Sequence, residues 1–208
     1  KEQWDHAQSV MAKILDDLDV KYEIGIDEAA FYGPKLDIQY KNVYGKEDTL
    51  VTIQIDMLLA ERFGMYYTDE NGEKKLPYII HRTSLGCYER TLAYLIEHYA
   101  GALPTWMAPE QVRFLPVTDR AVDYCKEQAA KLTNQGYRVT VDTRSEKIGK
   151  KIRDAQMEKI PYMLIVGDRD IEAGTVSPRH RADGDLGAMS LDAFAATLKD
   201  VVDSKSQK

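Results

Sequence analysis

The side chains with the clearest chemical potential lie in one short segment that begins at His81 and ends at Arg90. Gly86 marks a turn there, and Glu89 and Arg90 fall in the first turn of a helix predicted over residues 88–100. A helix N-terminus favours anions through its free N–H groups and dipole, and an arginine adds a planar charged fork suited to phosphate. The segment therefore predicts a phosphate-binding corner, with a plain helix start and a Glu89–Arg90 surface pair as the alternative.

Further candidate side chains precede this corner. Tyr32 and Lys35 flank a rigid Gly-Pro turn, which places a phenol and an ammonium at a sheet edge where they could meet an anionic or polar ligand. An ordinary hairpin with exposed Tyr and Lys is the alternative. Gln54 and Asp56 lie two residues apart on a predicted strand, so both are expected on the same side of the sheet.

The histidine and cysteine pattern does not encode a complete zinc site. The sequence has no CxxC or HxxxH pattern, and a lone histidine at a strand end, such as His81, is more often a structural residue than a ligand. Two cysteines, Cys87 and Cys125, provide no disulfide framework and suggest a reducing compartment. No apolar run approaches the roughly 20 residues that cross a bilayer, so no membrane association is expected.

The predicted secondary structure differs between the two halves of the chain. Glycine and two prolines between residues 101 and 109 indicate a boundary, which gives predicted domains 1–103 and 104–208. Hydrophobic spacing in the first domain predicts an α+β fold with an antiparallel sheet. Its predicted elements are a helix over 5–18, a strand over 22–26, a hairpin of strands 36–40 and 50–56, and a strand over 76–80.

The second predicted domain alternates strands and helices, which indicates an α/β fold with a mostly parallel sheet between helices. Pro178 fits poorly in a central strand, so residues 175–181 are expected at a sheet edge. The other predicted strands are 112–117, 137–142 and 162–166, and the predicted helices are 119–134, 146–157 and 191–202.

Charge and polar residues in the second domain indicate a nucleic-acid contact. The net charge is −6, but residues 144–159 hold six basic residues against three acids, a pattern whose alternative is a solvated helix face. Ser145 is a candidate helix N-cap just past a strand end, where open α/β sheets bind ligands. Arg153, Asp170 and Arg179 are predicted to form a polar rim there, because acid beside arginine suits the edges of unstacked bases.

Taken together, these segments resemble the class II aminoacyl-tRNA synthetases, and within them the threonyl-tRNA synthetase family. The resemblance covers nearly the whole chain, from about Trp4 to about Val202. Its carrying segments, specific by their order and spacing, are Ala30-Phe31-Tyr32-Gly33-Pro34-Lys35, Ile53-Gln54-Ile55-Asp56, Pro77-Tyr78-Ile79-Ile80-His81-Arg82, Leu85-Gly86-Cys87-Tyr88-Glu89-Arg90, Pro104-Thr105-Trp106-Met107-Ala108-Pro109, Glu146-Lys147-Ile148-Gly149 and Ile160-Pro161-Tyr162-Met163-Leu164.

The resemblance implies ATP-dependent activation of threonine, with Mg²⁺ accompanying ATP, and transfer of threonine to tRNA(Thr). Positioning and electrostatic stabilisation dominate such chemistry. Arg90 resembles the arginine of the third class II motif, which holds the ATP γ-phosphate, and Lys35 is implied to act with it in catalysis. The residues implied to line the threonine and ATP pocket are Tyr32, Gln54, Asp56, Cys87 and Arg90.

The resemblance also implies a zinc ligand and an anticodon site. His81 resembles one of three zinc ligands, a Cys and two His, with the other two expected upstream of Lys1. The metal there binds the amino and hydroxyl groups of threonine, and a site built for the hydroxyl rejects valine well. The second domain resembles the anticodon-binding domain of the family. The residues at its base-reading positions are Ser145, Arg153, Asp170 and Arg179.

Three residues depart from the family pattern: Thr49 replaces a pocket Gln, Cys87 a pocket Ser, and Ser145 an anticodon-contacting Asn.

We also expect a cytoplasmic enzyme that is a homodimer at full length. This chain is expected to be a fragment that alone neither activates threonine nor holds catalytic zinc. The alternatives are a non-catalytic tRNA-binding paralogue and another class II synthetase, such as the prolyl or histidyl enzyme.

Overall fold

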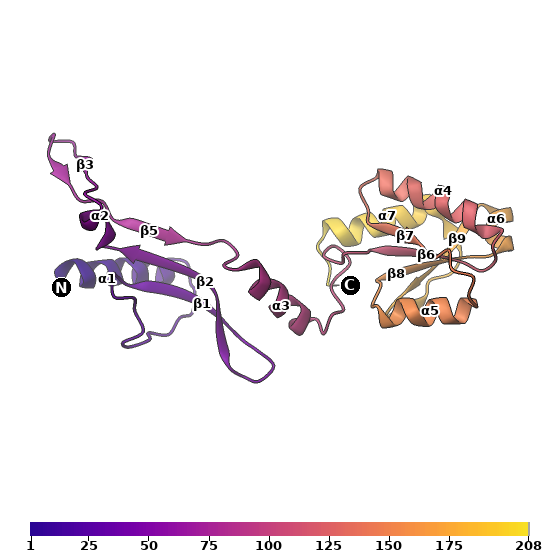
Figure 1. Cartoon of the computed structure of the whole chain (residues 1–208), viewed down its shortest axis with the longest axis horizontal. Coiled ribbons are helices and arrows are strands. Elements are labelled where there is room, and N and C mark those ends of the chain that lie inside the picture. Colours follow the sequence, from indigo (N-terminus) through magenta and orange to yellow (C-terminus); the bar gives the residue numbers. More distant parts are fainter. Residues whose placement is uncertain (208) are drawn as a thin grey trace. The chain divides into compact units, whose positions relative to one another are not determined.

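In a computed structural model, which describes residues 1–207, the chain folds as two compact units, the first over Lys1–Tyr94 and the second from Leu95 onward (Figure 1). The division falls inside helix α3, Tyr88–His98. The domain boundary predicted after residue 103 rests on glycine and proline content alone and stays a prediction.

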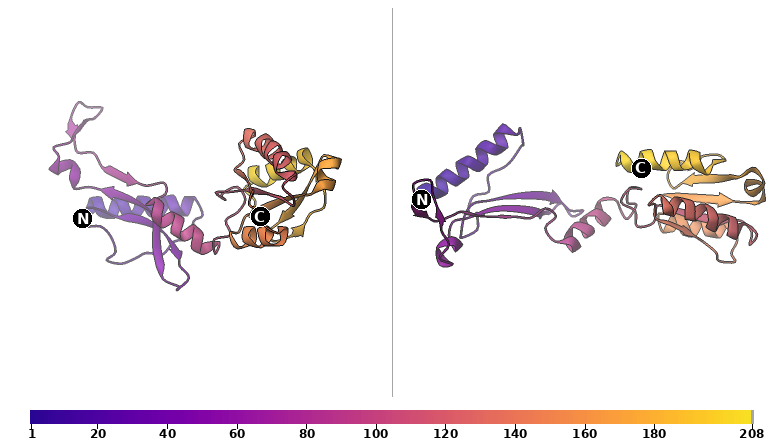
Figure 2. Two further views of the ribbon diagram at one scale, coloured as in Figure 1. Left: turned by 45° about the vertical axis from the view of Figure 1, so that its right-hand side comes forward. Right: turned by 90° about the horizontal axis from the view of Figure 1, so that it is seen from above.

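The first unit is built on a three-stranded antiparallel sheet with the order β1-β2-β5, which Figure 2 shows from two sides. The predicted hairpin and amphipathic helix are confirmed. The elements of this unit are α1 (Glu2–Asp17), β1 (Lys35–Lys41), β2 (Glu47–Asp56), α2 (Leu59–Arg62), β3 (Tyr67–Thr68), β4 (Lys74–Lys75), β5 (Ile79–Arg82) and the start of α3.

Two strand predictions in the first unit need correction. Residues 22–26 form no strand, and Ile24 and Ile26 are exposed, because among the described residues no neighbouring strand pairs with this segment. The strand predicted over 76–80 begins later, at Ile79, and pairs with β2. Pro77 explains the shift, because proline has no N–H to donate to a strand ladder.

The second unit is the predicted α/β fold. Strands β8, β6 and β7 are parallel, and β9 runs antiparallel beside β8. The elements of this unit are the end of α3, then β6 (Val112–Pro116), α4 (Ala121–Asn134), β7 (Val139–Val141), α5 (Ile148–Met157), β8 (Tyr162–Val166), α6 (Asp168–Ala173), β9 (Thr175–His180), β10 (Gly184–Asp185), β11 (Met189–Ser190) and α7 (Leu191–Asp203).

Side chains alternate between the two faces of the sheet in the second unit and form a hydrophobic core on each face. Phe114 and Leu164 pack with Phe194 on the side of α4 and α7, whereas Leu115 and Met163 pack on the side of α5. Figure 1 shows α4 and α7 on one side of these strands and α5 on the other. The sheet is therefore covered by helices on both faces, as a largely parallel sheet requires.

Strand β9 lies inside the sheet, so the predicted edge position is wrong. It pairs with β8 on one side and with the short strands β10 and β11 on the other. Pro178 lies between the residues that pair with those two short strands, and its carbonyl accepts a hydrogen bond from the Leu186 N–H on that side. The missing N–H of Pro178 thus falls in a gap of the ladder, where it costs no strand pairing.

A buried carboxylate, Asp56, ties three elements of the first unit together. Its side chain is fully buried, accepts hydrogen bonds from the backbone N–H groups of Leu58 and Leu59, each at 2.9 Å, and lies 3.0 Å from Nε2 of His81. Burial alone would raise the pKa of Asp56, but the hydrogen bonds from His81, Leu59 and Leu58 hold that pKa below its usual value. The end of β2, the start of α2 and β5 are therefore linked through one ionised group.

Acidification is expected to weaken the first unit through Asp56. A carboxyl with a lowered folded-state pKa contributes stability that is present above its unfolded pKa of about 3.9 and lost as the pH falls through the folded-state value. Urea unfolding of the first unit should therefore show a loss of stability on acidification below about pH 3.9. That loss should be smaller in Asp56→Asn. The exposed Asp27 provides the control, Asp27→Asn. An unchanged acid loss in Asp56→Asn would contradict the role given to this carboxylate.

The core of the second unit should depend on Phe194, which is fully buried between α7 and the sheet and meets the Tyr162 ring edge-on at 5.4 Å. Phe194→Ala is expected to lower the free energy of unfolding by about 3–5 kcal/mol, because it removes a large side chain and leaves a cavity. Phe31→Ala, at a ring that is 81% exposed, should change it by less than about 0.5 kcal/mol. Denaturant titration followed by circular dichroism would measure both, and similar costs for the two variants would refute this packing.

Candidate functional site

Three of the predicted site residues form one transverse row across the sheet of the first unit. Lys35 on β1 is the Cα partner of Gln54 on β2, and Gln54 is the partner of His81 on β5. Directly opposed residues of antiparallel strands project to the same face, and Asp56 shares that face with Gln54 because it lies two positions on. The strand register therefore gathers an ammonium, an amide, an imidazole and a carboxylate on one surface.

The turn before β1 brings Tyr32 to this row. The Tyr32 hydroxyl donates to Oε1 of Gln54 at 2.6 Å, and its ring lies 5.9 Å from that of His81. Gly33 allows the close approach, because a Cβ at that position would collide with the Ile55 carbonyl. Backbone bonds from Ile55 N–H to the Pro34 carbonyl and from Met57 N–H to the Tyr32 carbonyl fasten the turn to β2. The Gly-Pro turn is thus a positioning device for Tyr32.

Lys35 is held by an acid that sequence reasoning did not select. Its ammonium forms an ion pair with Asp37, whose other carboxylate oxygen accepts a hydrogen bond from Thr52 Oγ1 at 2.7 Å. The Lys35 side chain is about one-quarter exposed, so it remains accessible to a ligand. Alternation along β1 was the available signal, because Asp37 lies two residues after Lys35 on the same face.

His81 and Asp56 have the arrangement expected around a metal ligand. A metal-binding histidine commonly donates its other ring N–H to a carboxylate, which fixes the tautomer and the orientation of the ring. With Nε2 of His81 directed at the buried Asp56 carboxylate, Nδ1 is the nitrogen left for a metal. Among residues 1–207, however, no group of three or more His, Cys, Asp or Glu side chains could hold a metal, so His81 would supply one ligand only.

Arg90 and Cys87 lie apart from this row. Arg90 Nη1 donates to the Thr49 carbonyl at 3.1 Å, and Cys87 Sγ lies 2.8 Å from the Glu89 carboxylate, so Glu89 faces the thiol rather than Arg90. Five residues of strand separate Thr49 from Gln54, which corresponds to about 17 Å. The structure therefore gathers Tyr32, Lys35, Gln54, Asp56 and His81, and it places Arg90 and Cys87 toward the opposite end of β2.

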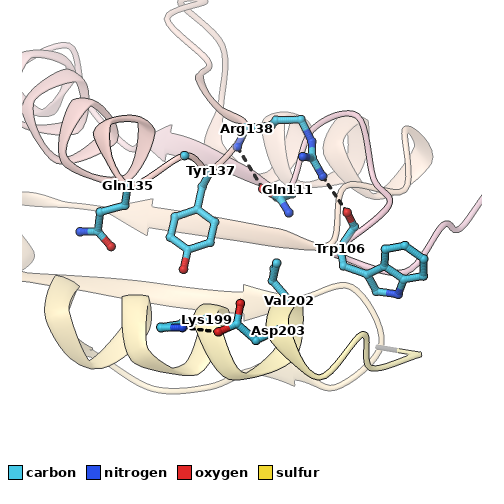
Figure 3. A pocket seen from close by; sticks show the side chains of 9 residues that line it. Trp106, Gln111, Gln135, Tyr137, Arg138, Lys199, Val202 and Asp203 are labelled. Atoms are coloured by element: carbon cyan, nitrogen blue, oxygen red, sulfur yellow. Dashed lines mark hydrogen bonds and ion pairs between the residues drawn. The ribbon is translucent and has the colours of Figure 1, made fainter.

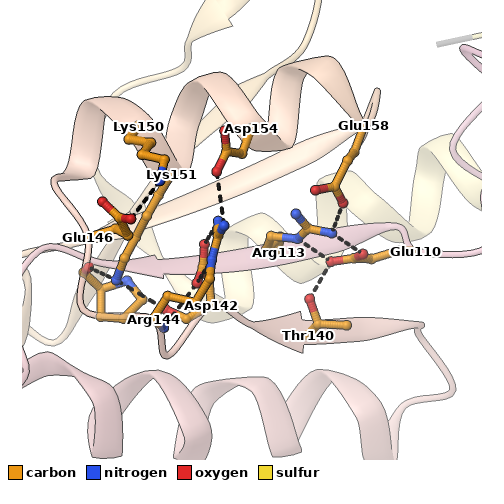
Figure 4. A network of polar contacts seen from close by, with 11 residues as sticks. Glu110, Arg113, Thr140, Asp142, Arg144, Glu146, Lys150, Lys151, Asp154 and Glu158 are labelled. Carbon is orange, nitrogen blue, oxygen red and sulfur yellow. Dashed lines mark hydrogen bonds and ion pairs between the residues drawn. The ribbon is translucent and has the colours of Figure 1, made fainter.

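In the second unit, a hollow of about 620 Å³ opens at the ends of β6 and β7. Ser145 lines it, but the prediction that Ser145 caps α5 is wrong, because the N-cap residue is Lys147, whose side chain forms no capping hydrogen bond. Figure 4 shows the polar residues beside the hollow, several of which were not selected from the sequence. The hollow is lined by Val117, Thr118, Asp119, Arg144, Ser145, Glu146, Lys147 and Lys151.

The predicted polar rim is partly engaged in holding the fold. Asp170 accepts hydrogen bonds from Gly167 N–H at 2.9 Å and Ser177 Oγ at 2.9 Å. Ser177 and Arg179 alternate on β9, so Arg179 shares the face that Asp170 reaches. Arg153 is exposed on α5, the helix that covers that face. Asp170 and Arg179 therefore lie on one side of the sheet, with Arg153 on the helix above it.

A second hollow, of about 480 Å³, lies on the other part of this unit and was not predicted (Figure 3). Its charged groups are already engaged: Arg138 donates to the carbonyls of Trp106 and Ala108, and Lys199 pairs with Asp203. Such engaged groups favour a structural role. Among the described residues, no helix combines the length and the apolar character required to cross a bilayer.

Family models match most of the chain in two consecutive stretches. Residues 2–99 match the tRNA synthetase class II core domain (G, H, P, S and T), and residues 111–201 match the anticodon binding domain. The two stretches correspond to the antiparallel sheet with α3 and to the largely parallel sheet.

Relatives of this chain carry the name threonine–tRNA ligase. The protein from Clostridium perfringens (strain SM101 / Type A) is 58% identical over 193 residues, which cover 93% of this chain and 30% of that protein. The protein from Clostridium botulinum (strain Eklund 17B / Type B) is 54% identical over 206 residues, covering 99% of this chain and 32% of that protein. The chain therefore spans about a third of the length of these relatives.

A solved structure agrees with the sequence comparison. The chain is similar to the RNA binding domain of threonyl-tRNA synthetase from Cryptosporidium parvum Iowa II, with a TM-score of 0.85 and 32% identity over 96% of this chain and 51% of that one. The fold, the two family models and the relatives all give the same answer: the chain belongs to the class II aminoacyl-tRNA synthetases, of which it carries part of the core domain and the anticodon-binding domain.

Proposed function

We propose that this chain is the part of a threonine–tRNA ligase that contributes one wall of the threonine and ATP site and the anticodon-binding domain. The observation that carries the proposal is the Lys35–Gln54–His81 row, completed by Tyr32, on one face of the first sheet. The ligase would join threonine to ATP, used with Mg²⁺, and then transfer the threonyl group to tRNA(Thr). Homodimer formation and a cytoplasmic location belong to the same proposal.

Each residue of the row has a role that suits its chemistry. His81, oriented by Asp56, would be one zinc ligand, and the zinc would supply a Lewis acid for the amino and hydroxyl groups of threonine. Tyr32 and Gln54, already hydrogen-bonded to each other, would orient the substrate beside it. Lys35 would meet negative charge near the α-phosphate, and the Asp37–Thr52 pair holds its ammonium in place until then.

Arg90 would hold the terminal phosphates of ATP. Its guanidinium has five N–H donors, and the bond from Nη1 to the Thr49 carbonyl leaves others for phosphate oxygens while fixing the direction of the fork. The separation of Arg90 from the Gln54 row along β2 suits a ligand whose triphosphate extends away from its reacting end. Cys87 would line the same site near Arg90.

Recognition of tRNA would rest on the second unit. Arg153 and Arg179 offer planar donor groups, and Asp170 and Ser145 offer acceptor oxygens, which together match the hydrogen-bonding edges of unstacked anticodon bases. The RNA backbone would add a salt-sensitive component through the basic stretch around α5.

A chimera tests the catalytic part of the proposal. In it, this chain replaces the matching segment of the Clostridium perfringens ligase, with which it is 58% identical. The chimera is expected to catalyse threonine-dependent pyrophosphate exchange, because the pocket residues are present, whereas the 208-residue chain alone is not. Arg90→Ala in the chimera should lower exchange about 100-fold, because it removes a charged contact to the transition state.

Arg62 provides the matched control, because it is an exposed arginine on α2 outside the row. Arg62→Ala should leave exchange within about twofold, as expected for a surface substitution. A folded chimera without any threonine-dependent exchange would favour a non-catalytic tRNA-binding paralogue instead. Exchange that depends on proline or histidine would favour another class II synthetase.

The anticodon-binding part predicts selective RNA binding by the chain itself. An RNA hairpin with a threonine anticodon should bind more tightly than one with exchanged anticodon nucleotides. Arg153→Met should weaken binding of the cognate hairpin about tenfold through lost base contacts. Lys126→Met on α4, 59% exposed, is the control and should have little effect. Fluorescence anisotropy would measure the affinities, and equal affinity for both hairpins would refute base recognition.

A further inference from the structure

Lys151 is a buried cation that lines the hollow at the ends of β6 and β7 in the second unit. It is only 4% exposed, and its ammonium donates hydrogen bonds to the carbonyls of Pro116, at 3.1 Å, and Asp142, at 3.2 Å (Figure 4). Pro116 is the last residue of β6, and Asp142 directly follows β7. Lys151 therefore joins the carboxyl ends of two neighbouring parallel strands.

The placement of Lys151 departs from the behaviour of its neighbours on α5. Lys150 lies outside, exposed, and forms an ion pair with Glu146 at 2.6 Å. Burial of an ammonium is costly unless hydrogen bonds and nearby negative charge compensate for the lost hydration. The hydrogen bonds to the two strand-end carbonyls offset part of the cost of burying Lys151, so the distance between those strand ends is coupled to this side chain.

The chain segments that leave those two strand ends form the walls of the hollow. Val117–Asp119 follow β6, and Arg144–Lys147 follow β7 and include Ser145. The second wall is fixed further because Arg144 binds the Asp142 carboxylate at 2.7 Å and Asp154 at 2.9 Å. The hollow between these walls is open to solvent and measures about 620 Å³, which leaves room for a planar base that enters from outside.

We propose that Lys151 is a positioning residue for anticodon recognition, which sets the separation of the β6 and β7 ends so that the hollow accepts one unstacked base of the tRNA anticodon loop. This inference rests on the proposed function of the second unit. Lys151 acts through the two strand ends and the loops that follow them, and Ser145 lies in one of those loops.

A direct contact between Lys151 and an RNA phosphate is the competing role, since an ammonium has three donors and two carbonyls occupy two of them. The two roles differ in their dependence on salt. Loss of one phosphate contact reduces the slope of log K against log [salt] by about 0.7 for single-stranded nucleic acid, whereas loss of positioning leaves the slope unchanged.

The test compares Lys151→Met with Lys150→Met in this chain. The dissociation constants of two RNA hairpins, one with a threonine anticodon and one with exchanged anticodon nucleotides, are measured at several salt concentrations. The ratio of the two constants does not depend on the fraction of folded protein. Lys151→Met is expected to lower this discrimination ratio about tenfold with an unchanged salt slope, because a hydrogen-bonded charge is lost. Lys150→Met should leave the ratio unchanged.

The possible results separate this inference from the function on which it rests. If the unaltered chain does not discriminate between the hairpins, the proposed anticodon function fails. If the unaltered chain discriminates and Lys151→Met leaves the discrimination ratio unchanged, the positioning role is wrong. A salt slope that falls with that unchanged ratio would indicate a direct phosphate contact instead. Should Lys151→Met not fold, Lys151→Gln, which retains a donor for one carbonyl, is expected to lower the same ratio by a smaller factor, and an unchanged ratio would overturn the inference.

Discussion

The hydrogen bond between the buried Asp56 carboxylate and His81 Nε2 is the contact on which the proposed catalytic surface depends. It joins β2 to β5 next to the Gln54–His81 pair and fixes which imidazole nitrogen faces outward. The same carboxylate accepts two backbone N–H groups at the start of α2, so its position is determined by three elements at once. Without an ionised group at Asp56, both the ring orientation and the strand ends beside it would lose their support.

In each unit a buried charged side chain holds strand ends through hydrogen bonds, and the sign of the charge differs between the two units. In the first, a buried carboxylate collects donors at the end of an antiparallel strand, and in the second, the buried ammonium of Lys151 collects carbonyls at the ends of two parallel strands. A buried charge is stable in few arrangements, because a movement that lengthens its hydrogen bonds leaves the free-energy cost of its desolvation uncompensated. Each charge therefore restricts the positions of the strand ends that supply its hydrogen-bond partners.

Much of the fold follows from sequence periodicity, but part of the site does not. Alternation along β1 and β2 predicted the hairpin, and the two-residue spacing placed Gln54 and Asp56 on one face. Register was not predictable, so the alignment of Lys35 with His81 emerged only from the pairing of three strands. The inward turn of Lys151 also escaped prediction, because its neighbours make the helix face look solvated. Pro178 led to the wrong prediction of an edge strand, since its missing N–H falls between the residues of β9 that pair with β10 and β11.

The role of Asp56 is tested most directly by the tautomeric state of the His81 imidazole, measured from the ¹⁵N chemical shifts of its ring nitrogens in the folded chain. If Asp56 orients the ring, the proton of the neutral imidazole lies on Nε2 and is donated to Asp56, with Nδ1 unprotonated and available to a metal. A neutral ring with its proton on Nδ1 would contradict the proposed orientation and, with it, the metal-binding role assigned to His81.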